Sequence, residues 1–255
     1  MLCQTEKFSV IDVPAMLKII PLSQGNKLYH EILAEADVNG DNTFNASIRD
    51  RENLIFDKAV TQQSLIYGEV TTIESFESIL ETIRPLINKK ERGIMIDLGS
   101  GSGRACLSTA ILASDIFHQA IGVELLPSLY GLSLSLQRTW NTKNINDCKL
   151  SFYKGSLLDL ACCDWTKASF VFCNSTAFDT ITFNSMAKLT TMMAKGSIFV
   201  SLTTELPITT GFKMVEELRL DFSWGQADVF IHIKDDNDDD GDDEIKKNDI
   251  KIQII

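Results

Sequence analysis

Three alternating glycines follow an acidic residue in the stretch GIMIDLGSGSGRACLSTAI, which covers residues 93–111. Glycine lets the backbone turn sharply, and it lets a ligand approach main-chain amides that no Cβ atom shields. Gly99, Gly101 and Gly103 therefore predict a ligand-binding turn between an apolar strand and the helical pattern that follows it. Asp97 is expected near the carboxyl end of that strand, beside the ligand.

Glu124 is the second residue whose position predicts chemistry, because it closes the apolar stretch AIGVEL. An acidic residue at the tip of a second strand can accept hydrogen bonds from both hydroxyls of a ribose, and two cofactor classes use this geometry. A dinucleotide fingerprint would need the spacing Gly-x-Gly-x-x-Gly, but Arg104 and Cys106 occupy the positions of its last glycine. A nicotinamide-dependent oxidoreductase is therefore the least favoured interpretation.

The pattern Asp-x-Gly-x-Gly-x-Gly resembles motif I of the class I S-adenosylmethionine-dependent methyltransferases. The resemblance implies S-adenosylmethionine as the cofactor, held by Asp97, Gly99, Gly101, Gly103 and Glu124. Asp97 would meet the α-ammonium group of the methionine part, a cation that a nicotinamide dinucleotide does not offer.

Short apolar runs alternate with helical patterns from residue 93 onward, which is typical of an α/β protein with a parallel sheet. Strands are predicted at 94–98, 120–125, 150–154, 170–174, 198–202, 215–221 and 229–233. Helices are predicted at 104–113, 127–140 and 180–194. The last two strands follow each other without a convincing helix and predict an antiparallel hairpin. We therefore expect a seven-stranded, doubly wound class I methyltransferase sheet of the Rossmann-like type.

Residues 1–90 differ in character from the rest of the chain. Helical patterns at 26–38 and 73–87 flank the polar stretch DVNGDNTFNASIRDREN. We expect residues 1–90 to form an N-terminal helical cap or lid over an S-adenosylmethionine-binding catalytic domain at 91–255.

The net charge of −11 is mostly local, because the stretch DDNDDDGDDE at 235–244 carries eight of the acidic residues and leaves about −3 for the rest. Such a run repels itself and buries little apolar area, so a disordered acidic loop is expected. It favours a basic protein partner. The chain has no basic cluster, so a direct grip on DNA phosphates is not expected.

Other composition features narrow the class of protein. No apolar run approaches the roughly 20 residues of a membrane helix, so no membrane association is expected and the chain is interpreted as intracellular. The six cysteines form no CxxC pair and are expected to be reduced, mostly buried thiols. The three histidines, His30, His118 and His232, are too scattered for a metal triad, and no metal site is predicted.

Two outlying segments and a tripeptide resemble one family in particular. YGEVTTIESFESIL from Tyr67, VFCNSTAF from Val171 and SWG at 223–225 follow the motif order of the disruptor-of-telomeric-silencing class. These are histone H3 lysine methyltransferases without a SET domain, and the resemblance spans residues 55–234. It implies a nuclear protein that acts on a histone or another basic protein, with the cytoplasm as the alternative location.

Carried over position by position, the resemblance implies roles for further residues. The segment Tyr67, Gly68 and Glu69 would close over the methionine end of the cofactor. Asn174 would lie beside the transferred methyl group, where its amide suits an amine acceptor, and Tyr67 and Trp224 would complete the catalytic set.

Several positions depart from the family pattern. Ser175 and Thr176 replace an Asn and a Phe, so a narrow aromatic lysine channel is not expected. Ser156 and Leu157 stand where an acidic and an aromatic residue bracket adenine in the family, with Asp159 as a displaced substitute. Arg104 replaces a Gln or Asn.

These features predict an S-adenosylmethionine-dependent protein-lysine N-methyltransferase. Two alternatives stay open beside a histone substrate. The string DLGSGSGR…AIGVELLPSLYGLSLSLQRTW also resembles small lysine methyltransferases of non-histone proteins, including the mitochondrial ATP synthase subunit type. The departures from the family pattern would suit a descendant that binds the cofactor and regulates a partner without catalysis.

Overall fold

The computed structural model of the chain describes residues 20–38, 40–56, 72–87, 91–222 and 224–235. The predictions for Tyr67, Gly68 and Glu69, and for the acidic run beyond Asp235, lie outside these residues. None of the helices in the described part of the chain is long and apolar enough to cross a membrane.

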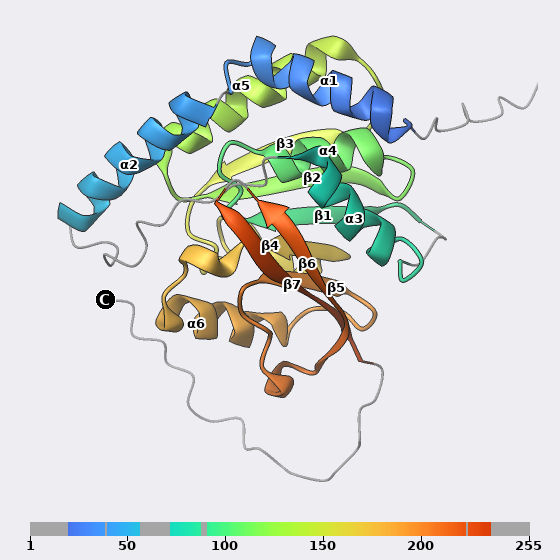
Figure 1. The fold of residues 1–255 in the computed structure, drawn as a ribbon. Coiled ribbons are helices and arrows are strands. Elements are labelled where there is room, and N and C mark those ends of the chain that lie inside the picture. Colours follow the sequence, from blue (N-terminus) through green and yellow to red (C-terminus); the bar gives the residue numbers. More distant parts are fainter. Residues whose placement is uncertain (1–19, 39, 57–71, 88–90, 223, 236–255) are drawn as a thin grey trace, which may run out of the picture.

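All seven predicted strands are present and form one sheet (Figure 1). The strands are β1 Gly93–Leu98, β2 Phe117–Glu124, β3 Lys149–Lys154, β4 Phe170–Cys173, β5 Ile198–Leu202, β6 Phe212–Phe222 and β7 Gly225–Lys234. Their order across the sheet is β3-β2-β1-β4-β5-β7-β6. The first five run parallel, and β7 pairs antiparallel with both β5 and β6. This is the class I methyltransferase fold, with the antiparallel hairpin that the sequence predicts.

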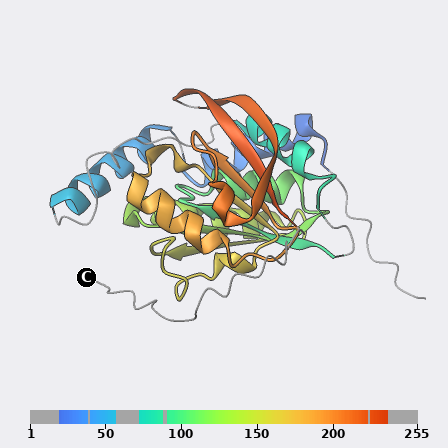
Figure 2. The same cartoon turned by 90° about the horizontal axis from the view of Figure 1, so that it is seen from below.

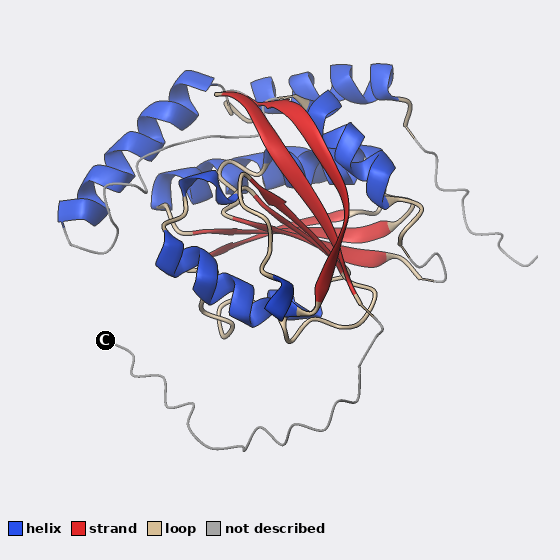
Figure 3. Ribbon diagram, turned by 60° about the horizontal axis from the view of Figure 1, so that its bottom comes forward, coloured by secondary structure: helices blue, strands red, loops and turns tan. Residues whose placement is uncertain are grey.

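Helices cover both faces of the sheet. On one face lie α4 (Arg104–Leu112) and α5 (Pro127–Lys143), and α1 (Leu22–Glu35) and α3 (Ile73–Ile83) pack onto α4. The other face carries α6 (Thr180–Thr190), which Figure 2 shows lying across the underside of the strands. In Figure 3 the red strands lie between these helical layers, and the β6–β7 hairpin extends beyond the rest of the sheet.

The residues of β1 alternate between two hydrophobic cores, as a strand buried on both faces requires. Met95 belongs to the core under α4, together with Phe76 of α3 and Phe172 of β4, whose rings meet edge to face at 5.1 Å. Ile96 and Leu98 belong to the core under α6. The alternation places Asp97 on the α4 face of the sheet.

One helix was not predicted. The polar stretch after α1 contains α2 (Gly40–Phe56), which packs against α5. Its described buried side chains are small or polar, so no apolar stripe marks the helix in the sequence; they are Thr43, Ala46, Ser47 and Asp50. The Asp50 carboxylate accepts hydrogen bonds from the amide of Ser128, at 2.5 Å, and from its hydroxyl, at 2.9 Å. These bonds join α2 to the first turn of α5.

Several predicted boundaries were wrong by a few residues. The prediction extended α6 to residue 194, but the helix ends at Thr190 and turns lead to Gly196, which has a φ of +77°. The last two strands are longer than predicted, because their outer parts are largely exposed and carry no apolar run. The predicted boundary at residue 90, between a helical cap and a catalytic domain, stays a prediction. In the structure α1 and α3 share the core of α4.

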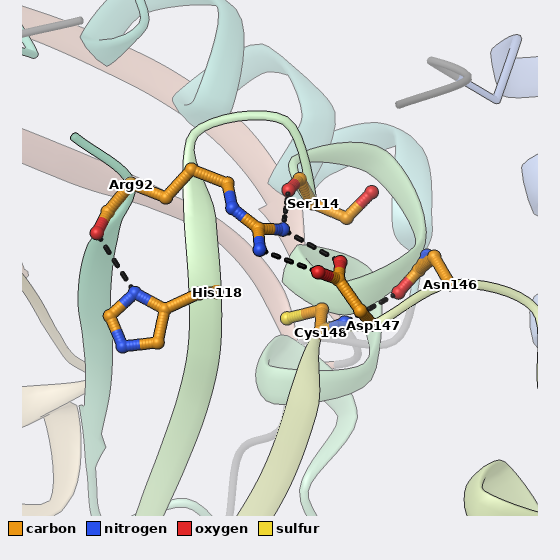
Figure 4. A network of polar contacts seen from close by, with 6 residues as sticks. All are labelled: Arg92, Ser114, His118, Asn146, Asp147 and Cys148. Atoms are coloured by element: carbon orange, nitrogen blue, oxygen red, sulfur yellow. Dashed lines mark hydrogen bonds and ion pairs between the residues drawn. The ribbon is translucent and has the colours of Figure 1, made fainter. Parts of the chain in front are cut away.

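An ion-pair network joins the amino ends of the first three strands, at the edge of the sheet opposite the glycine turn (Figure 4). The Arg92 guanidinium donates two hydrogen bonds to the Asp147 carboxylate, at 2.7 and 2.6 Å, and a third to the Ser114 carbonyl oxygen at 2.9 Å. His118 Nδ1 donates to the Arg92 carbonyl oxygen at 2.8 Å. Arg92 holds the pKa of Asp147 below its usual value, while burial raises the pKa of Cys148 to about 12. This network is structural.

Phe152 of β3 determines where glycine is required beneath the turn. A Cβ atom on Gly103 or on Gly122 would lie 2.5 Å from its ring. Gly122 is the neighbour of Phe152 in the β2–β3 register, and it also lies against the Ser100 hydroxyl. The glycine in AIGVEL is therefore a packing requirement of the same turn.

We expect Gly122→Ala to lower the free energy of unfolding by about 1 to 3 kcal/mol, because the added methyl group overlaps a packed ring. The matched control is Gly131→Ala on α5, where nothing lies within 4 Å of the new Cβ atom. Alanine should stabilise that exposed helical position by about 0.5 to 1 kcal/mol. Urea unfolding of both variants checks the pair, and equal midpoints would contradict the packing explanation.

His232 of β7 is buried, and burial lowers its pKa below the ordinary 6.5. Its Nε2 accepts from the Leu206 amide and its Nδ1 donates to the Phe199 carbonyl oxygen, both at 3.3 Å. As the pH falls below 6.5, the unfolded chain takes up this proton before the folded one, so stability should fall. His232→Gln keeps a donor and an acceptor without titrating.

Unfolding free energies measured from about pH 7.5 to about pH 5.5 should therefore fall more steeply for the wild-type chain than for His232→Gln. If the unfolding free energies of both proteins changed equally with pH, His232 would have the same pKa in the folded and unfolded chains.

Candidate cofactor and acceptor site

The glycine turn lies where the sequence predicts it, between the carboxyl end of β1 and the start of α4. All three glycines have positive φ angles, +79° at Gly99, +55° at Gly101 and +92° at Gly103. Residues with a Cβ atom rarely adopt this conformation. The amides of Gly99 and Ser100 both donate to the Val123 carbonyl oxygen, at 2.9 and 3.0 Å, which fixes the turn onto the end of β2.

The Glu124 carboxylate lies directly under this turn. Its Oε2 accepts a hydrogen bond from the Gly101 amide and its Oε1 accepts one from the Leu126 amide, each at 2.7 Å. The side chain is 6 % exposed. A carboxylate has two oxygens and about four acceptor positions, and the hydroxyls of a ribose are donors suited to such a group.

Asp97 is 3 % exposed and lies beside Gly122 of β2 and Phe172 of β4 in the register of the sheet. Burial raises the pKa of the Cys106 and Cys173 thiols, and the negative charge of Asp97 raises both further. These two cysteines are therefore buried, protonated thiols, as predicted. A buried carboxylate beneath the turn is suited to an ammonium group.

Ser100 adds a feature that the sequence did not single out. Its side chain is 4 % exposed, and its hydroxyl has no hydrogen-bond partner among the described residues. A buried hydroxyl that no protein group satisfies is expected to find a partner outside the chain. The unsatisfied group lies in the turn that the glycines keep open.

Ser156 and Leu157 lie in the turn after β3, next to Glu124. The Gly155 amide donates to the Glu124 carbonyl oxygen at 3.0 Å and joins the two strand ends. Ser156 Oγ accepts from the Leu158 amide at 3.2 Å, and the Leu157 carbonyl oxygen accepts from the indole of Trp165 at 2.7 Å. The turn that contains both residues therefore lies next to Glu124.

Asp159, the displaced substitute for the family's acidic residue, is exposed. Its Oδ1 accepts from the Ala161 amide at 3.1 Å, within its own turn.

Asn174 follows β4 at the same edge of the sheet, at the start of a short loop that runs to Phe178. Its Oδ1 accepts from the Thr176 amide at 3.4 Å and caps the single 3₁₀ turn of this loop. The Phe178 ring lies 3.7 Å from the position of a Cβ atom on Gly99. The structure therefore brings the loop of Asn174, called the acceptor loop (residues 174–178) below, against the glycine turn.

Ser175 and Thr176, the two residues of this loop that depart from the pattern of the resembled family, fix the loop to the end of β5. Ser175 Oγ donates to the Leu202 carbonyl oxygen at 2.5 Å, and the hydroxyls of Thr176 and Thr203 share a hydrogen bond of 2.8 Å. The motif VFCNSTAF contains Phe178, so its place near the site could be anticipated. Nothing in the sequence pointed to Thr203.

Trp224 lies at the tip of the β6–β7 hairpin. Leu202, the last residue of β5, pairs with Val229, so Gly225 and Trp224 lie beyond the end of β5 at the carboxyl edge of the sheet. The Trp224 ring stacks on Phe222 with centroids 4.9 Å apart, and Ser75 of α3 donates to the Asp221 carbonyl oxygen at 2.7 Å. The hairpin tip is thereby fixed to the start of α3.

Within the residues that the structure describes, no group of three His, Cys, Asp or Glu side chains could hold a metal ion. His30 lies on α1, His118 at the amino edge of the sheet and His232 inside β7. These three residues do not meet.

No protein-family model matches the chain, and no curated protein sequence matches it. Several solved structures show weak similarity. A protein assigned as the methyltransferase yhhF from Escherichia coli aligns with a TM-score of 0.49 at 13% identity, over 64% of this chain and 86% of its own. The rRNA methyltransferase aviRa from Streptomyces viridochromogenes aligns with a TM-score of 0.48 at 9% identity, over 68% of this chain and 90% of its own.

The M1A22 tRNA methyltransferase TrmK from B. subtilis gives a TM-score of 0.47 at 12% identity, over 66% of this chain and 68% of its own. Each similarity is too weak to carry an argument about substrate. The fold rests on the strand order of this chain. S-adenosylmethionine is the cofactor of class I methyltransferases, and the open turn, the Ser100 hydroxyl and the Glu124 carboxylate fit it.

We expect Glu124→Gln to lower the free energy of unfolding by about 1 to 3 kcal/mol, because one buried N–H then loses its acceptor and faces an NH₂ group. Glu205→Gln is the control, since Glu205 is an exposed carboxylate just after β5. Urea unfolding compares the two variants. A variant at Glu124 as stable as the control would show that its carboxylate does not hold the turn.

Proposed function

We propose that the chain is an S-adenosylmethionine-dependent methyltransferase whose acceptor is a lysine amine of a basic protein. The observation that carries the methyltransferase part of the proposal is the contact of the acceptor loop with the glycine turn, where Phe178 lies against Gly99. Asn174 follows β4 and so lies at the same edge of the sheet as the buried carboxylates of Asp97 and Glu124.

The roles of the cofactor-binding residues follow from their chemistry. Glu124 is suited to the ribose hydroxyls, Asp97 to the α-ammonium group and the glycine turn to a close approach of the backbone. Ser156 and Leu157, in the turn next to Glu124, would border the adenine. When bound, the cofactor supplies an electrophilic methyl group on a sulfonium.

Methyl transfer to an amine depends more on the alignment of the amine than on acid–base groups of the protein. An attacking amine must be neutral, and a partly buried site favours the neutral form of a lysine. The Asn174 carbonyl oxygen is an acceptor for an amine N–H, and a hydrogen bond of this kind fixes the direction of the amine lone pair. Alignment and exclusion of water then supply much of the acceleration, and no dedicated base or metal is needed.

The proposal of a protein-lysine substrate rests on the resemblance to the disruptor-of-telomeric-silencing class and on charge. The net charge of −11, with its acidic run at 235–244, favours a basic protein over a nucleic acid. Because the chain lacks a basic cluster for DNA phosphates, free histone is a better substrate than a nucleosome. A histone substrate would imply a nuclear location.

Two alternatives belong to the same proposal. A non-histone lysine, as in the mitochondrial ATP synthase subunit type, would use the same residues. A cofactor-binding descendant without catalysis would account for the departures at Ser156, Leu157, Ser175 and Thr176. The hydroxyls of Ser175 and Thr176 fix the acceptor loop onto the end of β5, and this is a structural role that an active enzyme could use.

Methyl transfer from radiolabelled S-adenosylmethionine tests the proposal. Free core histones, nucleosomes, total cell protein and total RNA are offered in parallel, and labelled products are identified by mass spectrometry. We expect labelled lysine in a free basic protein and weak labelling of nucleosomes. Asn174→Ala should lower the rate by about 100-fold or more while the affinity for S-adenosylhomocysteine stays within about twofold.

Asn184→Ala on the exposed face of α6 is the matched control and should leave the rate unchanged. Strong nucleosome labelling would overturn the charge argument, and labelled RNA would replace the protein substrate. Tight cofactor binding without any labelled product would support the descendant without catalysis.

A further inference from the structure

β5 ends in an unusually tight turn beside the acceptor loop. The Thr204 amide donates to the Leu202 carbonyl oxygen at 2.7 Å, two residues back, and the central residue, Thr203, has a φ of +69°. This is a γ-turn with a positive central φ, the rare and strained form of that turn.

Thr203 is an outlier among the residues that adopt positive φ. In the described part of the chain the others are six glycines together with Asp37 and Asn144. Glycine, Asp and Asn tolerate this conformation, whereas a β-branched side chain is strained in it. A glycine at position 203 would make the same turn without strain, so the geometry of the turn does not explain the threonine.

Hydrogen bonds around the turn hold the strained backbone in place. The Thr203 amide donates to the Asp228 carbonyl oxygen of β7 at 2.9 Å. Ser201 Oγ donates to the Thr204 carbonyl oxygen at 2.7 Å. Strain of this kind persists only where the surroundings determine the conformation, and it is found most often at functional sites.

The strained turn presents two groups to the acceptor loop. The Leu202 carbonyl oxygen accepts from Ser175 Oγ at 2.5 Å, in addition to the Thr204 amide. The Thr203 hydroxyl meets the Thr176 hydroxyl at 2.8 Å. Thr176 is in turn the residue whose amide donates to Asn174 Oδ1. A chain of contacts therefore runs from Thr203 through Thr176 to Asn174.

We infer that Thr203 is a positioning residue for the methyl acceptor. Its strained backbone aims the hydroxyl at Thr176, and Thr176 fixes the acceptor loop so that the Asn174 amide is set before the substrate binds. Preorganisation of this kind raises the rate of transfer without altering cofactor affinity. The inference rests on the proposed function for its kinetic part, and its structural part stands without it.

Substitutions at 203 separate the hydroxyl from the backbone strain. Thr203→Ala and Thr203→Gly both remove the hydroxyl, but only glycine relieves the positive φ. The glycine variant should therefore melt at a higher temperature than the alanine variant, the reverse of the usual order. Thr203→Ser keeps the hydroxyl, and Thr176→Val removes its partner with little change in shape. Thr209→Ala, in the exposed turn before β6, is the control.

Hydrogen exchange and kinetics read out the position of the acceptor loop. Thr203→Ala, Thr203→Gly and Thr176→Val should each speed amide exchange in residues 174–178 and leave residues 97–104 unchanged. In the same variants kcat should fall about 10- to 100-fold with S-adenosylhomocysteine affinity unchanged, and Thr203→Ser should restore most of the rate. The double variant Thr203→Ala/Thr176→Val should be no slower than either single variant, because both remove one contact.

Three results would overturn the inference. They are unchanged exchange at 174–178 in the variants without the hydroxyl, a glycine variant that melts below the alanine variant, or full transfer activity without the Thr203 hydroxyl. If the wild-type chain transfers no methyl group to any acceptor, the proposed function fails. The exchange and melting series then still decides whether the strained threonine fixes the loop.

Discussion

The site depends on one buried carboxylate. Glu124 accepts hydrogen bonds from the amides of Gly101 and Leu126, and so it joins the glycine turn to the end of β2 from below. Two main-chain donors that point at the same carboxylate must be placed together by the folded chain, and the parallel pairing of β1 and β2 does this. The positive φ angles of the three glycines let the turn reach this carboxylate, and the absent side chain of Gly122 leaves room beneath the turn for the ring of Phe152.

The acceptor side of the site is built on the neighbouring pair of strands, β4 and β5. Its polar contacts come from short hydroxyl side chains, so the acceptor loop can lie close to β5 and still satisfy its polar groups. Thr176 stands at a position where a narrow lysine channel would need an aromatic residue. Hydrogen bonds from Ser175 and Thr176 hold the loop of Asn174 against the end of β5.

The sequence predicted the sheet well because its strands are apolar runs buried on both faces, and because glycines and acidic residues at strand ends mark a ligand-binding turn. It did not predict α2, whose buried face consists of Thr43, Ala46, Ser47 and Asp50 and leaves no periodic pattern. Contacts between segments far apart in the sequence could not be predicted either. The bond between Thr176 and Thr203 and the strain at Thr203 arise only when β4 and β5 are paired, so residue types alone carry no signal for them. The ends of the apolar runs predicted the places of Glu124 and Asn174 at the carboxyl edge of the sheet, while their roles stay predictions.

The central claim is that the turn above Glu124 holds S-adenosylmethionine. Isothermal titration of the purified chain with S-adenosylhomocysteine tests it most directly, with a nicotinamide dinucleotide as the competing ligand class. We predict saturable binding of one molecule in the low to middle micromolar range, about −7 to −8 kcal/mol, and no heat from the dinucleotide. Asp97→Asn should weaken binding, because the α-ammonium group loses its counter-charge. Saturable binding of the dinucleotide, with no heat from S-adenosylhomocysteine, would contradict the account.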